Sequence, residues 1–503
     1  MANGELSWKG RRRGAGILLH PSSLPGPFSV GTFGESAYRF VDFLRDSGQR
    51  YWQILPLNPF GTGFSPYQSP SVWAGCPLYI DPDLLVNDGL LTADECCSAQ
   101  VGSPDLADYA LAQERQEPLL RLAFSRGREM LSREVAIFYR ENGGWLSDHA
   151  LFSAAQRHFG GAALQDWPDG ALLRREPGAL GYWQRELAEE ISFEVFLQFL
   201  FFRQWRALRE YANQNGIFII GDLPIYCSSD SVQVWSRPEL FRVDEHLRPE
   251  AYSGVPADGF SPSGQFWGNP LYRWEAHEKS GFSWWRARLR HALTLCDIVR
   301  LDHFRGFHSY WEIPLEAKAA SEGFWREGPG ESFISLLREE AFGAGFIAED
   351  LGDLSPEARR FTEDSGLPRM RVLTDAFGSG PDNPFLPHNC PINSIIYTST
   401  HDSPTFLEWY REASPDARQF ASRYLRLRLE EGISWGAAAG AWESSSVLSM
   451  APMQDILGLG EDARMNRPST VGGRNWRWRV RREAFNAEVS SRLRELTEIY
   501  GRL

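Results

Sequence analysis

The stretch Ile298-Val-Arg-Leu-Asp302-His303 is a short run of β-favouring residues that ends on an acid and a histidine. Two later stretches have the same form, Phe346-Ile-Ala-Glu349-Asp350 and Tyr397-Thr-Ser-Thr-His401-Asp402. A strand of a parallel barrel delivers side chains to its carboxyl-terminal rim in this way. Because such strands end at one rim, acids that lie far apart in the sequence can converge there. The three stretches therefore predict a parallel sheet with acids along its carboxyl edge.

Eight short apolar runs occur along the chain, and helical patterns separate most of them. They are residues 16–20, 51–55, 217–222, 298–302, 346–349, 369–373, 395–399 and 446–450. Alternation of strands and helices predicts an α/β protein with a parallel sheet, and eight units favour a closed (β/α)₈ TIM barrel. Periodicity alone leaves an open, doubly wound sheet as the alternative.

The helical patterns also indicate how the chain is divided. Apolar residues at helical spacing predict helices over residues 35–46 and 193–214, the second ending before Gly216. The connection from residue 55 to residue 217 is far longer than the roughly 30 residues of a strand–helix–strand unit. We therefore predict a barrel made of residues 1–84 and 189–503, with a mainly helical subdomain of residues 85–188 inserted at its carboxyl-terminal rim.

One further segment is predicted as a long rim loop that acts as a lid. Residues 252–271 are rich in Gly, Pro, Ser and aromatic residues. Long loops in compact enzymes are often functional.

Composition limits the classes of partner. The net charge of −13 repels phosphate backbones and anionic lipid, so we expect neither a nucleic-acid nor a membrane partner. The N-terminus lacks the apolar segment of a secretory signal. The six cysteines show no C-x-x-C pair and no zinc spacing, which predicts reduced thiols in a cytoplasmic protein. The oligomeric state cannot be read from the sequence.

Asp302 and Glu349 are candidates for acid–base chemistry. Arg300 and Asp302 lie on the same face of a strand, where the cation should lower the pKa of the carboxyl group and keep it ionised. Glu349 could serve as a general acid beside other acids. The structural alternatives are an Arg–Asp pair at a strand end and, for Asp350 and Asp353, acids that begin the next helix.

Polar and aromatic groups elsewhere could bind a ligand. His401 and Asp402 could bond sugar hydroxyl groups or could only cap a strand end. Trp267 offers a stacking face between the amides of Gln265 and Asn269, although the segment could be a turn packed by its aromatics. Ser65-Pro-Tyr67-Gln68 is open to the same two interpretations.

This set of groups fits one reaction class best. Glycosidic bond cleavage needs two acids, and a third can stabilise the positive charge that develops. The content of 19 Trp is compatible with glycan binding. The chain contains no Walker A sequence, no H-E-x-x-H and no G-x-S-x-G elbow, so nucleotide, zinc-protease and serine-hydrolase chemistry are disfavoured.

Taken together, the motifs resemble those of the 4-α-glucanotransferases known as amylomaltases or disproportionating enzymes (glycoside hydrolase family 77). The resemblance covers nearly the whole chain. Its motifs occupy residues 18–27, 65–69, 220–224, 267–274, 300–306, 348–352, 383–388, 400–402 and 463–466.

The resemblance implies a (β/α)₈ barrel, retaining transfer of α-1,4-glucan segments, and no metal or organic cofactor. It implies that Asp302 is the nucleophile, Glu349 the general acid/base and Asp402 the stabiliser of the transition state. It further implies a set of substrate-binding residues, namely Asp222, Arg300, His303 and His401 around the cleavage point and Ser65, Tyr67, Phe260, Gln265, Trp267 and Asn466 along the groove. The expected partners are maltooligosaccharides and glucans derived from starch or glycogen.

The chain departs from the family pattern at three places. Ser403-Pro404 follows Asp402 where the family usually has Asn-Asp, Gly378-Ser379 stands where an acidic pair is common, and Gly259 replaces a frequent Tyr. These changes bear on chain-length preference and acceptor affinity. Two other functions compete with transfer, namely an amylase-type α-glucan hydrolase and a non-catalytic glycan-binding protein.

Overall fold

A computed structural model describes residues 6–259, 261–341 and 345–503 of the chain. Eight parallel strands close into a barrel in the order β1-β12-β11-β10-β9-β6-β3-β2. The strands are β1 (Gly14–Leu18), β2 (Tyr51–Gln53), β3 (Phe218–Leu223), β6 (Ile298–Leu301), β9 (Gly345–Ala348), β10 (Arg369–Val372), β11 (Ser394–Tyr397) and β12 (Leu448–Pro452).

The barrel confirms the predicted fold class. Each of the eight apolar runs contributes one strand, with ends that shift by one or two residues. The pairing of β1 with β12, in which Gly14 faces Leu448 and Leu18 faces Pro452, closes the sheet and rules out the open, doubly wound alternative.

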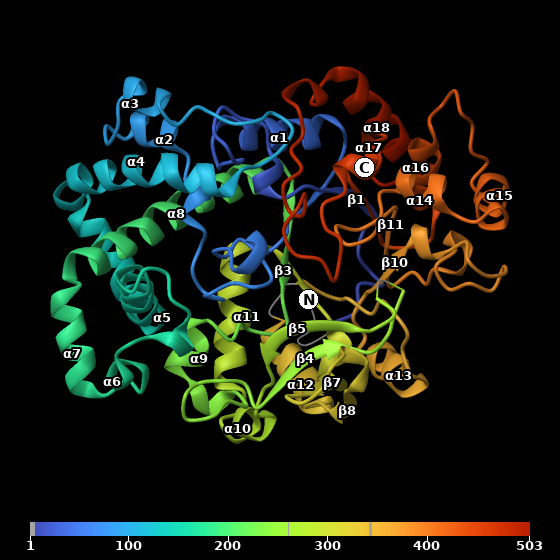
Figure 1. The fold of residues 1–503 in the computed structure, drawn as a ribbon. Coiled ribbons are helices and arrows are strands. Elements are labelled where there is room, and N and C mark those ends of the chain that lie inside the picture. Colours follow the sequence, from blue (N-terminus) through green and yellow to red (C-terminus); the bar gives the residue numbers. More distant parts are fainter. Residues whose placement is uncertain (1–5, 260, 342–344) are drawn as a thin grey trace.

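Helices surround the barrel, as Figure 1 shows. They are α1 (Glu35–Asp46), α2 (Pro82–Asn87), α3 (Ala93–Cys97), α4 (Tyr109–Met130), α5 (Ser132–His158), α6 (Gly170–Leu173), α7 (Pro177–Glu186), α8 (Ala188–Gln214), α9 (Val232–Ser236), α10 (Trp274–Lys279), α11 (Ser283–Leu295), α12 (Glu331–Glu340), α13 (Pro356–Ser365), α14 (Phe406–Glu412), α15 (Pro415–Tyr424), α16 (Ile433–Glu443), α17 (Met453–Ile456) and α18 (Ala487–Ile499). The predicted helix over residues 35–46 matches α1, whereas α8 begins five residues before the predicted start.

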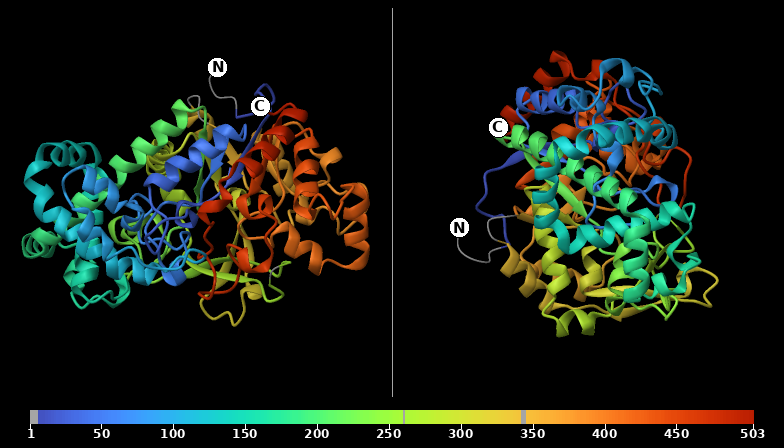
Figure 2. Two further views of the ribbon diagram at one scale, coloured as in Figure 1. Left: turned by 90° about the horizontal axis from the view of Figure 1, so that it is seen from above. Right: turned by 90° about the vertical axis from the view of Figure 1, so that its left-hand side faces the viewer.

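Residues 85–188 contain α3 to α7, which pack with α8 at one side of the molecule, opposite α14 to α16 (Figure 2). Aromatic side chains join α5 to α8, with Phe138 against Phe199 and Trp145 against Phe202. The boundaries of a separate subdomain stay a prediction.

The predicted rim loop over residues 252–271 is wrong for about half of its length. The segment contains β4 (Ala251–Val255) and β5 (Gln265–Pro270), which join β7 (Ser309–Pro314) and β8 (Phe324–Glu327) in an antiparallel sheet of order β5-β4-β7-β8. β4 pairs with β5 on one side and with β7 on the other, and β7 lies more than 50 residues away, with Tyr252 facing Ile313. A local pattern of Gly, Pro and Ser could not reveal that pairing.

Two apolar clusters stabilise the barrel. The inner cluster includes Ile220, Ile347, Met370 and Tyr397, which fill the space within the strands. The outer cluster lies between the strands and the helices. All six cysteines are free thiols. Among the described residues, no helix has the length and apolar character needed to cross a bilayer.

Candidate active site

The centre of the site lies where the neighbouring strands β6 and β9 end. Leu301 of β6 is the register partner of Ala348 of β9, and Asp302 and Glu349 are the next residues of each strand. Adjacent strands lie about 4.8 Å apart. The two acids therefore leave the barrel side by side at its carboxyl-terminal rim.

Backbone N–H groups hold the Glu349 carboxyl group in place. The N–H of His303 donates to Oε2 at 2.7 Å and that of Leu351 donates to Oε1 at 2.9 Å. His303 adopts a left-handed backbone conformation with φ of 50°, which is strained for a residue with a side chain. The strained backbone at His303, the residue after Asp302, is therefore held by its hydrogen bond to the Glu349 carboxyl group.

Arg300 lies inside the barrel mouth with two acids around it. Its Nη1 donates to both oxygens of Asp222 at 2.7 and 2.8 Å and to Oδ1 of Asp302 at 2.8 Å. Asp222 of β3 is its register partner, and both side chains are almost fully buried. One guanidinium group thus faces two carboxyl groups, and Glu349 adds a third acid nearby.

This crowding of acids changes the protonation of the pair. Burial raises the pKa of Asp302 to about 7 against the opposing effect of Arg300, and the neighbouring carboxyl groups add to the rise. Burial also raises the pKa of Glu349. Arg300 acts in the direction expected from the sequence, but the expected low pKa of Asp302 is wrong because desolvation outweighs the cation. Near neutral pH the two groups hold a proton between them.

Asp402, beyond the end of β11, has the opposite character. His401 Nε2 lies 3.2 Å from Oδ2, and Asn466 Nδ2 donates to Oδ1 at 2.6 Å. Burial acts to raise its pKa, but His401 and the hydrogen bond from Asn466 outweigh burial and bring the pKa to about 2. Asp402 is therefore ionised at neutral pH.

Tyr67 connects the two sides of the rim. Its hydroxyl group donates to Oδ2 of Asp222 at 2.7 Å and lies 2.9 Å from Nε2 of His401. Its ring stacks on the imidazole with a centroid distance of 5.5 Å. The segment around Tyr67 thereby joins the acid on β3 to the histidine beyond β11.

Strand β5 supplies an aromatic wall. The indole ring of Trp267 meets His303 edge to face at 4.8 Å, and its N–H donates to Oε1 of Gln265 at 3.2 Å. Gln68, which the sequence places in a segment that is either a binding loop or a turn, donates to the carbonyl oxygen of Trp267 at 2.9 Å. The β5 wall is thus fastened to the segment that carries Tyr67.

The remaining predicted residues fall at the margin or outside the description. Ser65 is half-buried, and its Oγ accepts the N–H of Tyr67 at 3.3 Å. Phe260 lies outside the described residues. The structure brings the other predicted residues to one rim, namely Tyr67, Asp222, Gln265, Trp267, Arg300, Asp302, His303, Glu349, His401, Asp402 and Asn466.

Two residues at the rim were not predicted. Arg464 Nη2 donates to the carbonyl oxygen of Asp402 and Nε to that of Asn466, each at 2.8 Å. Trp476 packs its ring near those of Tyr67 and His401. Arg464 belongs to a motif already recognised at residues 463–466, whereas no local pattern around Trp476 points to the rim.

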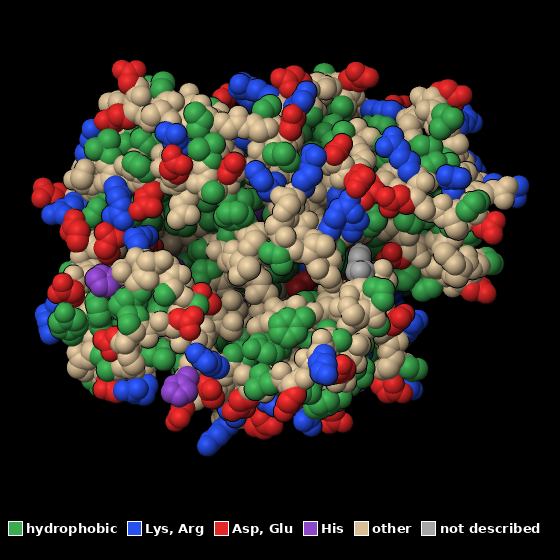
Figure 3. Space-filling model, viewed as in Figure 1, with side chains coloured by type: hydrophobic (Ala, Val, Ile, Leu, Met, Phe, Trp, Pro, Cys, Tyr) green, Lys and Arg blue, Asp and Glu red, His purple; other side chains and the backbone are tan. Residues whose placement is uncertain are grey.

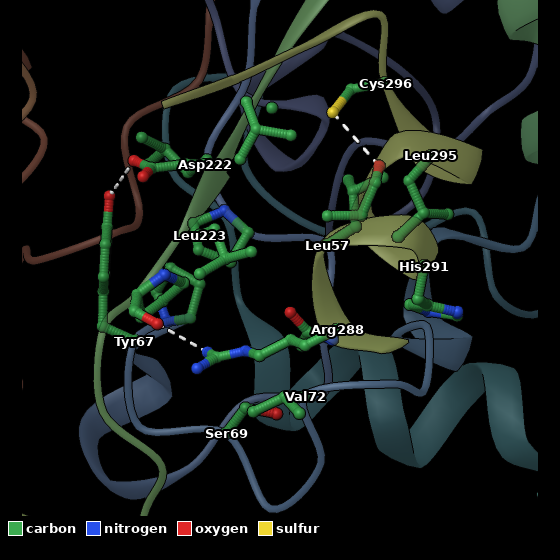
Figure 4. Close-up of a pocket in the computed structure, with 18 of the residues that line it drawn as sticks. Leu57, Tyr67, Ser69, Val72, Asp222, Leu223, Arg288, His291, Leu295 and Cys296 are labelled. Atoms are coloured by element: carbon green, nitrogen blue, oxygen red, sulfur yellow. Dashed lines mark hydrogen bonds between the residues drawn. The ribbon is translucent and has the colours of Figure 1, made fainter. Parts of the chain in front are cut away.

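A hollow on the surface and a small internal cavity lie near the rim. The face drawn in Figure 3 is hollowed near its centre, with acidic groups visible in its depth. Figure 4 shows a separate cavity behind Tyr67 and Asp222, between β3 and α11, with a volume of about 50 Å³ and mainly apolar walls that include Leu57, Val72 and Leu223. That cavity has room for a few water molecules but not for a sugar ring.

Comparisons with known proteins agree on one family. The sequence profile described as 4-alpha-glucanotransferase matches residues 19–484. The 4-alpha-glucanotransferase of Thermus thermophilus is 44% identical over 98% of this chain and 99% of its own length. The enzyme of the same name from Clostridium butyricum is 41% identical over 96% of this chain and 100% of its own length.

Solved structures give the same picture. The amylomaltase from Streptococcus agalactiae, solved in complex with acarbose, superposes with a TM-score of 0.95 at 40% identity, covering 98% of this chain and 100% of that one. The amylomaltase from Corynebacterium glutamicum, at 18% identity and a TM-score of 0.76, covers 99% of this chain and 76% of that one and shares the fold.

Proposed function

The chain belongs to the 4-alpha-glucanotransferase family, and we propose on that premise that it transfers a segment of an α-1,4-glucan to the 4-hydroxyl of another glucan or of glucose. The proposed route is a retaining double displacement through a covalent glucosyl–enzyme. The observation that carries it is the placement of Asp302 and Glu349 directly after the register partners Leu301 and Ala348 of neighbouring strands. Retaining glycoside chemistry needs two carboxyl groups about 5–5.5 Å apart.

In the first step Glu349 donates its proton to the glycosidic oxygen while an oxygen of Asp302 attacks the anomeric carbon. The bond to the leaving glucan breaks, and the bond to Asp302 forms. In the second step the 4-hydroxyl of an acceptor loses its proton to Glu349 and displaces Asp302 from the anomeric carbon. Two inversions give net retention. The two carboxyl groups balance every proton and electron pair, so the scheme calls for no metal or organic cofactor.

Two features of the surroundings favour Glu349 as the group that holds the shared proton. Arg300 donates directly to Asp302 at 2.8 Å, so it stabilises negative charge there more than on Glu349. Burial raises the pKa of Glu349, which favours its protonated form. The resting enzyme then holds an ionised nucleophile beside a protonated acid, which is the state that the first step requires.

Asp402 suits the role of transition-state stabiliser. A carboxylate that is ionised at neutral pH can stabilise the positive charge of an oxocarbenium-like ring. His303 Nε2 is buried and has no hydrogen-bond partner among the described residues, so a sugar hydroxyl could supply one. Asp222 and His401 complete the polar surroundings of the cleavage point.

The groove residues fit a long, neutral polyhydroxyl ligand. Trp267 offers an apolar ring face beside the Gln265 amide, and sugars need both kinds of surface. Ser65, Tyr67 and Asn466 extend the polar lining. The substrates proposed are maltooligosaccharides and α-1,4-glucans from starch or glycogen. The free thiols are consistent with a cytoplasmic protein.

Incubation with maltotriose tests the function. Transfer produces glucose together with a ladder of longer maltooligosaccharides while the total concentration of reducing ends stays constant. A steady rise in reducing ends would instead support an amylase-type hydrolase. Binding of maltotriose without any change in chain length would support a non-catalytic glycan-binding protein.

A further inference from the structure

The segment that carries His401 and Asp402 has no regular structure of its own. It spans residues 398–405, between the end of β11 and the start of α14. A group that stabilises a transition state must be held within a fraction of an ångström of its working position. Something outside the segment must therefore fix it.

Asp455 lies beneath this segment and is fully buried. It belongs to α17, which directly follows β12, the neighbour of β11 in the barrel. Its Oδ2 accepts the hydroxyl groups of Thr398 at 2.5 Å and Ser399 at 2.6 Å, and its Oδ1 accepts the N–H of Phe406 at 2.7 Å. One carboxyl group thus fastens both the entry and the exit of the segment.

Packing alone does not account for an acid at this place. Burying a carboxyl group is costly, and an apolar residue of similar volume usually serves stability as well or better. The three hydrogen-bond partners of Asp455 among the described residues are all uncharged donors. The carboxyl group instead orients the segment. Its Oδ2 accepts from Thr398 and Ser399 at the entry, and its Oδ1 accepts from Phe406 at the exit.

We propose that Asp455 is a positioning residue that sets the place of Asp402 at the catalytic rim. The inference rests on the proposed function, since it deepens the role given to Asp402. Within the segment, Ser403 Oγ accepts the N–H of Thr400 at 2.7 Å, so the turn that carries Asp402 behaves as one unit. Fixing the two ends of that unit fixes its centre.

The opposite side of the segment has an anchor of its own. Arg464 donates to the carbonyl oxygen of Asp402 and pairs with the buried Glu408 at 3.3 Å. Loss of Asp455 should therefore shift the segment without unfolding it. This makes substitution of Asp455 an informative experiment.

Asp455→Asn preserves size but turns an amide N–H₂ toward the backbone N–H of Phe406 or toward the two hydroxyl groups. We expect kcat for maltotriose disproportionation to fall about 10- to 100-fold, the range for a displacement of about 1 Å, with KM changed by less than about threefold. The kcat must be referred to the folded, active fraction of each variant, because a general loss of stability would lower the apparent kcat without changing KM.

Asp81→Asn is the matched control. Asp81 is also a buried acid that accepts a hydroxyl group, that of Thr32 at 2.5 Å, and a backbone N–H, that of Leu84 at 3.1 Å. It caps α2 and has no hydrogen bond to the segment of residues 398–405. Asp81→Asn should lower the midpoint of thermal unfolding by a similar amount and leave kcat within about twofold of the wild type.

A second set of variants tests whether Asp455 acts through the hydroxyl groups of Thr398 and Ser399. The double variant Thr398→Val with Ser399→Ala removes two donors and should reproduce most of the fall in kcat. Adding Asp455→Asn to it should cause little further loss, because the three side chains act as one unit. Losses that multiply would overturn the proposal.

Other outcomes would also overturn it, namely wild-type kcat in Asp455→Asn, or an equal fall in kcat in Asp81→Asn. Failure of this inference is distinguishable from failure of the proposed function. If the wild type forms no maltooligosaccharide ladder, the proposed function fails and this inference with it. If the wild type forms the ladder and Asp402→Asn loses it while Asp455→Asn forms it at the wild-type rate, only the inference fails.

Discussion

The two ends of the barrel each bury an arginine, and the two arginines have opposite surroundings. At the carboxyl-terminal rim Arg300 faces the carboxyl groups of Asp222 and Asp302. At the amino-terminal end Arg502, the penultimate residue, is fully buried. It donates to the carbonyl oxygens of Gly14, Trp442, Ser444 and Ser446.

The two arginines have different roles, Arg300 in the chemistry at the rim and Arg502 in the closure of the sheet at the amino-terminal end. Negative neighbours raise the pKa of Arg300 in spite of burial, whereas burial, with a contribution from Arg13, lowers the pKa of Arg502 to about 9. The rim therefore gathers charges that a reaction can use, and it leaves polar atoms such as His303 Nε2 without a hydrogen-bond partner in the part of the chain that the structure describes. At the other end the four carbonyl oxygens that accept from Arg502 belong to neighbouring backbone segments, β1 among them, where the sheet closes.

The largest effect expected at the rim is loss of reaction without loss of fold. Asp302→Asn removes the proposed nucleophile, so kcat for maltotriose should fall by on the order of 10⁴-fold or more, as when a covalent nucleophile is removed from other enzymes. Its thermal unfolding midpoint at pH 7.5 should be equal to or above that of the wild type, because Arg300 keeps Asp222 and one crowded acid is neutralised.

Asp462→Asn is the control for that variant. Asp462 is 91% exposed and pairs with Arg474 near the motif that carries Asn466. Its kcat should equal that of the wild type. A clear fall in the stability of Asp302→Asn would contradict the contrast between the two ends, since it would show that the rim acids stabilise the fold.

The next largest effect belongs to the other end. Arg502→Met keeps much of the side-chain volume but leaves buried carbonyl oxygens without donors, so the free energy of unfolding should fall by about 3–5 kcal/mol. The kcat of the folded fraction should not change. Urea unfolding followed by tryptophan fluorescence measures the first quantity, and active-fraction-corrected kinetics measure the second.

Arg494→Met provides the comparison, because Arg494 lies exposed on α18 with a single long hydrogen bond of 3.5 Å to the carbonyl oxygen of Asp46. Its effect on stability should be within about 0.5 kcal/mol. An equal loss in both variants would show that the buried carbonyl contacts of Arg502 contribute nothing specific.

Single residues show how much of the difference between the two ends of the barrel could be predicted from the sequence. Strand positions were predictable because each barrel strand is a short apolar run, and the rim acids were predictable because they follow those runs directly. The eight units favoured a closed barrel, but periodicity alone left an open sheet as the alternative, since the pairing of Gly14 with Leu448 joins residues at opposite ends of the chain. Arg502 looks like any residue of a polar terminus, and its burial depends entirely on that closure.

The site was predictable to a similar extent. Motifs located the three acids, but not the raised pKa of Asp302, because desolvation depends on how many neighbours surround it in space. Asp455 follows an ordinary apolar run, and nothing nearby in the sequence reveals that Thr398 and Ser399 donate to it.

The pH dependence of stability sharpens the contrast further. In the unfolded chain Asp302 should titrate at about 3.9, whereas in the folded protein the buried pair of Asp302 and Glu349 keeps one shared proton up to about 7, the pKa of Asp302. Between these values the folded protein binds more protons than the unfolded chain, so the free energy of unfolding falls as pH rises through the window. Asp302→Asn lacks this contribution.

Thermal unfolding midpoints at about pH 4.5 and 6, inside this window, and at about pH 7.5, just above it, measure the effect. The midpoint of Asp302→Asn relative to the wild type should rise across the series. The difference between Arg502→Met and the wild type should stay constant, because Arg502 remains protonated up to a pKa of about 9. Parallel curves for Asp302→Asn and the wild type would show that the acid titrates alike in both states.

The smallest effect concerns the choice between transfer and hydrolysis, and two neighbouring residues of β5 allow it to be isolated. Trp267 contacts His303 at the rim, whereas Phe266 points to the other face of the sheet, is 58% exposed and packs on Tyr252. If Trp267 holds the acceptor glucan against the glucosyl–enzyme, Trp267→Ala should favour water, because an aromatic contact of about 0.5–1.5 kcal/mol corresponds to a change of about 2- to 10-fold in the ratio of hydrolysis to transfer.

Phe266→Ala removes a ring from the same strand and should leave that ratio unchanged. Release of reducing ends, divided by the formation of longer maltooligosaccharides, gives the ratio directly. Equal ratios in the two variants would mean that the rim excludes water by some group other than Trp267, and the assignment of the β5 wall to the acceptor would have to be abandoned.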